Sequence, residues 1–292
     1  MELVAEDIDC FNVLKGEGRG QNDRMNKLRE RILAVLVNPD RPFQTDSKWN
    51  EISSKLNNTL KGLYSGDVDR MTLTPRGGRG NNHDFILKMF LSNETVFEMN
   101  LEFKYNAKTI AESPQYLSLP AKYTQVTYAE FFYDNYITQL CNLHPSLIAP
   151  SRSDYLKHVH QPVYEALPFF KTLKTLKSSD NGVSNNLTRI SKESIQKFLE
   201  LYKETVDYHT VIAHIQKTQA DKIFLLWKTN SFKIDKFTPE ELDIAGPVDP
   251  GSKGKNTIVL GCKKSNSTHH MLLRWRNNLC VLFPAWQIKL AR

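Results

Sequence analysis

Residues 95–105, TVFEMNLEFKY, alternate strictly between apolar and polar side chains. A period of two is typical of a β-strand with one buried face, because successive side chains point to opposite sides of a sheet. The polar side is unusual, since Glu102 and Lys104 stand about 7 Å apart along the strand and on the same side. A carboxylate and an ammonium placed in this way can jointly hold a metal ion and a water molecule.

The segments before this strand also show regular spacing of apolar residues. Apolar residues at helical spacing predict helices over 22–37 and 45–63, and weaker alternation predicts strands over 68–74 and 83–91. We therefore expect a three-stranded meander over 68–105 that follows an amphipathic helix.

The rest of the chain predicts a helical region followed by strands. Helices are expected over 128–143 and 169–177, residues 178–186 are expected to form a polar loop, and a long helix is expected over 191–216, with a start signal at Ser191. The predicted strands then cover 222–227, 231–237, 257–262, 269–275 and 280–290.

These elements predict an α/β fold. The expected core is a helix, a mixed sheet of about three to four strands and a further helix, with a helical middle and a mostly β C-terminal portion. We expect three parts: a core over 1–145, a helical connecting region over 146–220, and a β-rich portion over 221–292 that grips nucleic acid.

Charge and cysteine usage narrow the class of protein. The chain has 39 Lys and Arg against 32 Asp and Glu, a net charge of +7, which favours a polyanionic partner but also fits a merely basic protein. The four cysteines are widely spaced, which excludes a closely spaced zinc site and a disulfide scaffold, and indicates an intracellular protein, cytoplasmic or nuclear. The acidic beginning is not typical of a signal peptide, and no apolar run approaches the ~18 residues of a membrane span, so no membrane partner is expected.

The triplet Glu102-Phe103-Lys104 is by itself weak evidence for a functional site. About four triplets of acid, any residue and base arise by chance in a chain of this composition. This one lies in a clear amphipathic strand, and Asp84 opens the strand before it. Since neighbouring strands lie about 4.7–4.9 Å apart, Asp84 and Glu102 would approach each other if the register allows. The alternative is a surface face of salt bridges on a hairpin.

Two carboxylates and a lysine suit chemistry on a phosphate. Carboxylates supply hard oxygen ligands to Mg²⁺, for which Mn²⁺ can substitute, and the metal would lower the pKa of a water molecule. A nearby lysine can orient or deprotonate that water, or stabilise the charge that builds on the phosphate.

The order of these elements resembles the PD-(D/E)XK nuclease superfamily, which has the restriction-endonuclease-like fold. The resemblance rests on a helix, two strands of which the second opens on Asp84, a strand carrying Glu102 and Lys104, and then a helix. His83 stands where the family often has proline. The resemblance covers about residues 45–143 and does not extend to the C-terminal half.

The resemblance implies a magnesium-dependent endonuclease that hydrolyses phosphodiester bonds with a metal-activated water, with DNA as the favoured substrate. It assigns catalytic roles to Asp84, Glu102 and Lys104, with Asp84 and Glu102 as metal ligands. The family frequently adds a glutamate from the preceding helix. Glu51 is the natural candidate for this third ligand and catalytic residue, and Glu30 is the second.

Basic residues elsewhere are candidates for contact with nucleic acid. They lie in a Gly–Arg turn, on a lysine stripe of a predicted helix and beside a tryptophan of a predicted strand: Arg76, Arg79, Lys171, Lys174, Arg274 and Arg276. A solvated face is the default for the lysine stripe, an incidentally charged hairpin loop explains the turn equally well, and a tryptophan in a small β core explains the last two as easily. A homodimer would suit paired cuts in a duplex, although no coiled-coil heptads signal one. The alternatives are a basic nucleic-acid-binding protein without catalysis and a protein-interaction module.

Overall fold

The alternating segment forms the strand β3 (Val96–Tyr105) in the computed structural model of the chain. The structure describes residues 10–11, 19–38, 47–76, 82–117, 123–161, 166–249, 257–276 and 279–292. The chain forms two compact units, the first made of Met1–Ser113 with Lys217–Leu242 and the second of Pro114–Gln216 with Asp243–Arg292.

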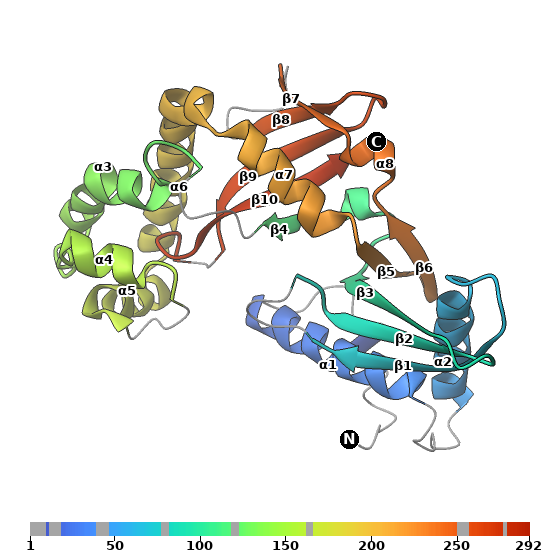
Figure 1. Cartoon of the computed structure of the whole chain (residues 1–292). Helices are drawn as coiled ribbons and strands as arrows, with labels where there is room; N and C mark the ends of the chain where they lie inside the picture. The colour runs from blue at the N-terminus through green and yellow to red at the C-terminus, as the bar shows by residue number, and fades with distance from the viewer. Residues whose placement is uncertain are drawn as a thin grey trace. The chain divides into compact units, whose positions relative to one another are not determined.

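The first unit is built on a mixed five-stranded sheet with the strand order β1-β2-β3-β5-β6 (Figure 1). The strands β1, β2 and β3 form the expected antiparallel meander, β5 pairs with β3 in parallel, and β6 pairs with β5 antiparallel. Its elements are α1 (Arg19–Val37), α2 (Ser47–Lys61), β1 (Val68–Pro75), β2 (Phe85–Leu91), β3, the 3₁₀ turn η2 (Ile110–Glu112), β5 (Lys222–Lys228), β6 (Ser231–Lys236) and α8 (Pro239–Leu242).

One face of this sheet is covered by α1 and α2. The apolar stripes predicted on the two helices pack against the alternate apolar residues of the strands, so that Ile32, Leu56, Leu87, Leu101 and Phe103 share one core. Buried and half-buried positions alternate without exception along β2, as expected for a central strand with one covered face. The polar residues of β3 are therefore left on the opposite face of the sheet.

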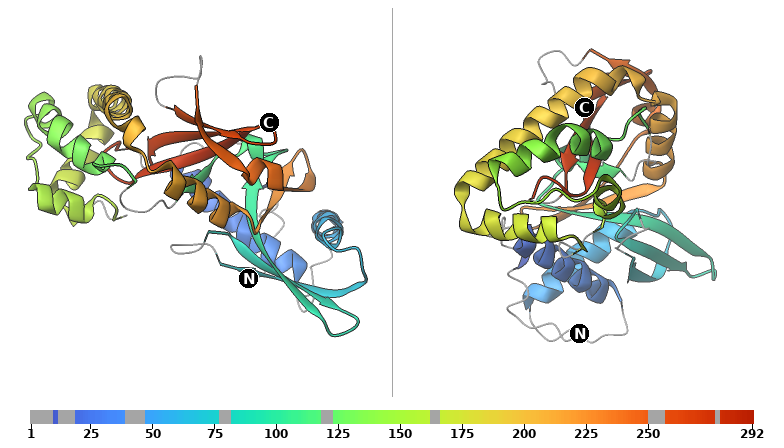
Figure 2. Two further views of the ribbon diagram at one scale, coloured as in Figure 1. Left: turned by 45° about the horizontal axis from the view of Figure 1, so that its top comes forward. Right: turned by 90° about the vertical axis from the view of Figure 1, so that its left-hand side faces the viewer.

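The second unit combines a helical cluster with an antiparallel sheet of order β4-β10-β9-β8-β7. Figure 2 shows the green helix α3 beside the yellow-gold helix α6. Aromatic side chains such as Tyr128, Phe132, Phe198 and Trp275 join these helices to the sheet. The elements are β4 (Gln115–Leu117), α3 (Tyr128–Leu143), α4 (Arg152–His158), α5 (Pro168–Ser179), α6 (Asn181–Tyr202), η4 (Lys203–Thr205), β7 (Ile244–Val248), β8 (Thr257–Cys262), β9 (Thr268–Trp275) and β10 (Pro284–Ala291), and α7 (Tyr208–Gln219) leads the chain back to the first unit.

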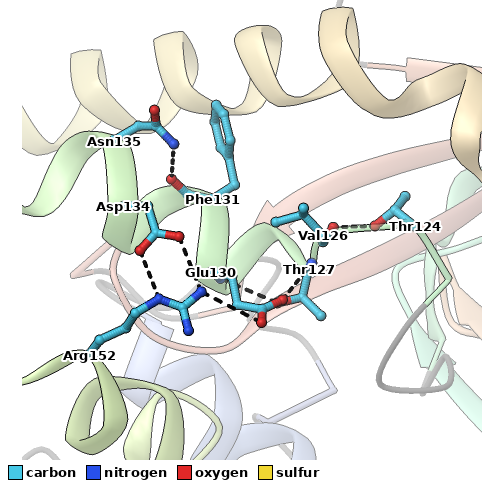
Figure 3. Close-up of polar contacts among 8 residues, drawn as sticks. All are labelled: Thr124, Val126, Thr127, Glu130, Phe131, Asp134, Asn135 and Arg152. Atoms are coloured by element: carbon cyan, nitrogen blue, oxygen red, sulfur yellow. Dashed lines mark hydrogen bonds and ion pairs between the residues drawn. The ribbon is translucent and has the colours of Figure 1, made fainter.

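Helix α3 begins with a capping box (Figure 3). The Thr127 hydroxyl accepts a hydrogen bond from the backbone N–H of Glu130 at 3.2 Å, and the Glu130 carboxylate accepts one from the backbone N–H of Thr127 at 2.9 Å. Arg152, in the first turn of α4, donates to both carboxylate oxygens of Asp134 at 2.8 and 3.1 Å. These contacts give hydrogen-bond partners to backbone N–H groups at the start of α3 and link α4 to that helix.

The helical middle differs from the sequence-based prediction. The polar loop expected over 178–186 is reduced to Asp180, whose carboxylate caps α6 by accepting from the N–H of Gly182 at 2.6 Å. The long helix expected over 191–216 is two helices, because the chain turns after Tyr202 and Asp207 starts α7 by accepting from the N–H of Thr210 at 3.0 Å. The strand expected from residue 280 begins at Pro284, since Cys280 and Phe283 have positive φ angles of 55° and 54°.

The two compact units divide the chain after residues 113, 216 and 242, and the second of these lies close to the boundary expected at 220. The strand β5, which follows 220, joins the first sheet because it pairs with β3. Parallel strands need a long crossover connection, and here that crossover contains most of the second unit. The first unit is therefore completed only by chain that follows this insertion.

Two further observations concern the described helices and the cysteines. None of the described helices is both long and apolar enough to cross a membrane. All four cysteines lie in the described part of the chain, and no two of them are joined in a disulfide.

Candidate functional site

A cavity of about 440 Å³ lies beside β3 in the first unit. The structure brings three of the predicted site residues, Asp84, Glu102 and Lys104, to its wall together with Glu30 of α1. The other lining residues are Asn26, Arg29, Phe103, Tyr105, Asn106, Glu112 and Ser113.

The register of the β2–β3 hairpin brings Asp84 beside Glu102. Phe85 pairs with Leu101, so Asp84, one residue earlier, stands opposite Glu102. The backbone N–H of Asp84 donates to the carbonyl of Leu101 at 2.9 Å, and its carboxylate accepts from the N–H of Phe103, also at 2.9 Å. The condition on which the sequence argument depended, a register that allows the two acids to approach, is met.

Glu102 and Lys104 form an ion pair with a distance of 2.6 Å between Oε1 and Nζ. Their side chains are only 13% and 22% exposed. The same sheet carries a second pair between Lys88 and Glu98, at 3.1 Å, but those side chains are 44% and 51% exposed. The alternative of a surface salt-bridge face therefore describes Lys88 and Glu98 well and does not describe the pair in the cavity.

Negative charge is in excess around the cavity. Four acids, Glu30, Asp84, Glu102 and Glu112, line it against two bases, Arg29 and Lys104. Burial, reinforced by the neighbouring Asp84 and Glu102 carboxylates, raises the pKa of Glu30 to about 7. Burial and the Glu102 carboxylate likewise raise the pKa of Asp84 to about 6, against the opposing effect of Lys104. The cavity would thus favour an additional cation.

Arg29 holds α1 against the end of β3. Its Nε donates to the carbonyl of Cys10 at 2.6 Å, and its guanidinium lies 3.4 Å from the centre of the Tyr105 ring. The Tyr105 hydroxyl in turn donates to the carbonyl of Phe11 at 2.9 Å. Glu30, the next residue along α1, lines the same cavity as Asp84 and Glu102.

Glu51, the first candidate for the helix acid, does not line the cavity. It is exposed on α2, where it pairs with Lys55 at 2.6 Å, and Lys55 also donates to the carbonyl of Asn230 at 3.0 Å. The apolar side of α2, with Trp49 and Ile52, faces the core, so that Glu51 is left on the outer side. The helix acid that lines the cavity is the second candidate, Glu30.

Lys222 of β5 was missed by the sequence analysis. Its Nζ lies 3.8 Å from Oε2 of Glu102, and its side chain is 6% exposed. Lys222 opens a run that was correctly predicted as a strand, but no local pattern shows that this strand pairs with β3. The parallel register, in which Lys222 faces Asn100 and Phe224 faces Glu102, carries that information.

The basic residues proposed for nucleic-acid contact are spread over the chain. Arg76 is exposed, and its backbone N–H donates to the carbonyl of Asp84 at 2.7 Å, so it lies next to the cavity residues. Arg79 lies outside the described residues. The remaining four are exposed on α5 and on β9 and its end in the second unit: Lys171, Lys174, Arg274 and Arg276.

The cavity offers a loose set of metal ligands rather than a closed cage. Within the described ranges, no three His, Cys, Asp or Glu side chains converge tightly enough to form a ready-made metal cluster. Mg²⁺ does not require one, because it usually keeps several waters and binds through one or two carboxylates together with substrate phosphates. Asp84 and Glu102, with Glu30 nearby, fit that requirement.

Comparisons with known proteins give little further guidance. No protein-family model and no curated protein matches the chain. Among solved structures, the restriction endonuclease MspI in complex with its cognate DNA aligns over 81% of this chain and 84% of that one, with 12% identity and a TM-score of 0.30. A likeness this low carries no argument about function, which has to come from the geometry of the cavity.

Proposed function

We propose that the protein is a magnesium-dependent endonuclease that hydrolyses phosphodiester bonds, with DNA as its favoured substrate. The observation that carries the proposal is the convergence of Asp84, Glu102, Lys104 and Glu30 on one acidic cavity. An acid at the start of one strand and an acid and a lysine two apart on the next are the features in which the chain resembles the PD-(D/E)XK nucleases.

The acids would act as the metal site. Asp84 and Glu102 would bind Mg²⁺, and Glu30 would replace Glu51 as the assisting helix acid. The raised pKa values of Glu30 and Asp84 support this assignment, because they reflect buried negative charge that a divalent cation would balance. When bound, Mg²⁺ would polarise the scissile phosphate and promote ionisation of a water molecule.

Lys104 would act on the attacking water and the phosphate. Its ammonium is held by Glu102 at 2.6 Å, and Lys104 lines the cavity, where it would orient a water oxygen or neutralise charge on the phosphate. In hydrolysis the water oxygen forms a bond to phosphorus and loses a proton, while the bond from phosphorus to the leaving sugar oxygen breaks and that oxygen gains a proton. Holding these groups in line is the contribution expected of the protein.

The basic character of the chain supports a nucleic acid as the partner. The net charge of +7 coexists with an acidic cavity, so the positive charge lies elsewhere on the molecule. This combination suits a nucleic acid whose sugar–phosphate backbone is attracted by a wide basic surface while one of its phosphates binds the metal. The exposed Arg76 next to Asp84 is the first residue we would assign to that contact.

The test is cleavage by the purified protein of supercoiled plasmid and of single-stranded RNA, with Mg²⁺, Mn²⁺ or EDTA. We expect plasmid nicking or linearisation that either metal supports and EDTA abolishes. Lys104→Ala should abolish cutting and leave DNA binding nearly intact. Lys88→Ala is the matched control, because it removes a lysine from an exposed ion pair of the same sheet, and it should cut like the wild type.

Three results would count against the proposal. Salt-sensitive binding of DNA without any cutting would indicate a nucleic-acid-binding protein without catalysis. Neither binding nor cutting would favour a protein-interaction module. Equal cutting by Lys104→Ala and wild type would remove Lys104 from the site.

A further inference from the structure

Lys222 is a buried cation that the proposed reaction does not use. Its side chain is 6% exposed, and it is not among the residues that line the cavity. A buried ammonium is strongly unfavourable unless it is paired, and the partner here is Glu102, whose Oε2 lies 3.8 Å from the Lys222 Nζ. The other oxygen of Glu102 is held by Lys104 at 2.6 Å. Two lysines therefore flank one carboxylate: Lys104, which lines the cavity, and Lys222, which is not among its lining residues.

The sheet topology explains how Lys222 reaches that position. In the parallel pairing of β3 with β5, Asn100 faces Lys222 and Glu102 faces Phe224, so these four side chains share one side of the sheet. Phe224 is fully buried, and its ring centre lies 5.8 Å from the Lys222 Nζ. The ammonium thus lies next to Glu102 with very little exposure to solvent.

We propose that Lys222 is a positioning residue, a counter-charge that holds the Glu102 carboxylate oriented in the metal-free protein. The inference rests on the proposed function in one respect, because it takes Glu102 as a metal ligand. Lys222 would fix one oxygen of the carboxylate, so that Glu102 has its working geometry before the metal arrives. The same positive charge opposes the entry of a divalent cation next to Glu102.

This double role has a signature that a merely structural lysine would not produce. Removing the charge should let Mg²⁺ bind more tightly, because one repulsive neighbour is lost. It should also slow turnover, because Glu102 is no longer held in place. A lysine that only supported the fold would weaken metal binding and turnover together when it is removed.

The experiment compares Lys222→Met, Lys222→Arg and Lys233→Met in the full chain. Methionine keeps the length and the apolar stem of lysine without its charge, and arginine keeps the charge. Lys233 is an exposed lysine of β6, the neighbouring strand, and serves as the matched control. Three quantities are measured: the Mg²⁺ concentration for half-maximal thermal stabilisation, the separate kcat and KM for plasmid cleavage, and the crystal structure without metal.

For Lys222→Met we expect the half-saturating Mg²⁺ concentration to fall about tenfold and kcat to fall about 10- to 100-fold, with KM within about twofold of wild type. Lys222→Arg should return the half-saturating Mg²⁺ concentration and kcat towards the wild-type values. Lys233→Met should change neither of these two quantities. The metal-free crystal structure of Lys222→Met should show Glu102 in another rotamer on an unchanged backbone.

Unchanged or weaker Mg²⁺ binding in Lys222→Met, or a changed KM with an unchanged kcat, would overturn the inference. The crystal structure tests it even if the wild-type protein neither binds Mg²⁺ nor cuts DNA. In that case the proposed function fails, whereas a rotated Glu102 still supports the positioning role and an unmoved Glu102 refutes it.

Discussion

The charged cluster at the cavity of the first unit and the Arg152 cluster of the second unit differ in how far they are buried. In the second unit, Arg152 and Asp134 form a two-point ion pair with side chains 47% and 44% exposed. In the first, Glu102 pairs with Lys104 and Lys222 at exposures of 13%, 22% and 6%. Exposed pairs contribute little to stability and place few demands on their surroundings, whereas buried charges require desolvation that their pairing only partly offsets.

The difference indicates where the chain has been shaped for something other than stability. The Arg152 cluster joins two helices and caps one of them, so folding alone explains it (Figure 3). The cavity gathers Glu30 and Asp84, whose raised pKa values show that ionising them opposes folding. Groups with strongly shifted pKa values inside a cavity are typical of functional sites. The comparison therefore predicts that substitutions in the two regions have opposite effects on activity and stability.

The largest effect is expected from Asp84→Asn. Loss of a metal-ligating charge should lower cleavage by roughly 10³-fold, or about 4 kcal/mol of transition-state stabilisation. At pH 8 the free energy of unfolding should not fall, and should rise by about 1–2 kcal/mol, because the ionised Asp84 opposes folding above its pKa of about 6. Asparagine can still accept the hydrogen bond from Phe103. Cleavage assays and urea denaturation at pH 8 check both.

Asp134→Asn is the matched control in the second unit, since Asp134 lies in an exposed ion pair. It should leave cleavage unchanged. Equal losses of cleavage in the two variants would remove the contrast between the cavity and the surface cluster.

A loss of stability without a loss of metal binding is expected from Phe132→Ala. Phe132 is fully buried in the second unit, with its ring centre 4.9 Å from that of Trp275. Deleting the ring should lower the free energy of unfolding by about 3–4 kcal/mol, through lost burial and the cavity that remains. The rise in melting temperature on adding Mg²⁺ should persist in this variant and be absent from Asp84→Asn. Denaturant unfolding and thermal scans with and without Mg²⁺ measure the two effects.

The elements that the sequence predicted well are those whose signal is local. The alternation in β3 and the apolar spacing of α1 and α2 each depend on neighbours within a few positions, and all three elements were found. The Asp84–Glu102 pairing could also be anticipated, because a short hairpin leaves few registers. The catalytic and metal-binding roles assigned to Asp84 and Glu102 stay predictions.

The parts that could not be predicted depend on contacts between distant segments. Lys222 reaches Glu102 only because β5 pairs in parallel with β3 across a long insertion, and no local pattern specifies that pairing. The choice between Glu30 and Glu51 depends on how each helix is rotated on the sheet. For α1 that rotation involves contacts between residues far apart in the sequence, such as the stacking of Arg29 on Tyr105.

A pH dependence of stability is expected from Glu30. Its folded-state pKa is raised from 4.5 to about 7, so its protonated form stabilises the fold, and that contribution is lost as the pH rises from about 4.5 through about 7. In Glu30→Gln this part of the decline should vanish. Between pH 4.5 and pH 8, without added metal, the free energy of unfolding of wild type should therefore fall by about 2 kcal/mol more than that of the variant. Urea denaturation across this range tests it. Parallel profiles for the two proteins would show that Glu30 ionises as it does in water.

Added Mg²⁺ should reverse the order of stability at pH 8. The ionised Glu30 opposes folding only while its charge is unbalanced, and a bound cation converts that charge into a ligand. Wild type should therefore gain more in melting temperature from Mg²⁺ than Glu30→Gln. An equal gain in the two proteins would exclude Glu30 from the metal site and leave Asp84 and Glu102 as its carboxylates.

The smallest effect is expected at the start of α3, and it sharpens the contrast from the side of the second unit. Thr127→Ala removes the side-chain acceptor for the N–H of Glu130 and should lower the free energy of unfolding by about 1 kcal/mol. Thr127→Ser keeps the acceptor and should lie close to wild type. Cleavage, Mg²⁺ binding and the pH profile should be the same in both variants, because the cap stabilises a helix end and takes no part in the cavity. A change in Mg²⁺ affinity on losing this cap would mean that the two units are energetically coupled, and that the division between a functional charge cluster and a structural one does not hold.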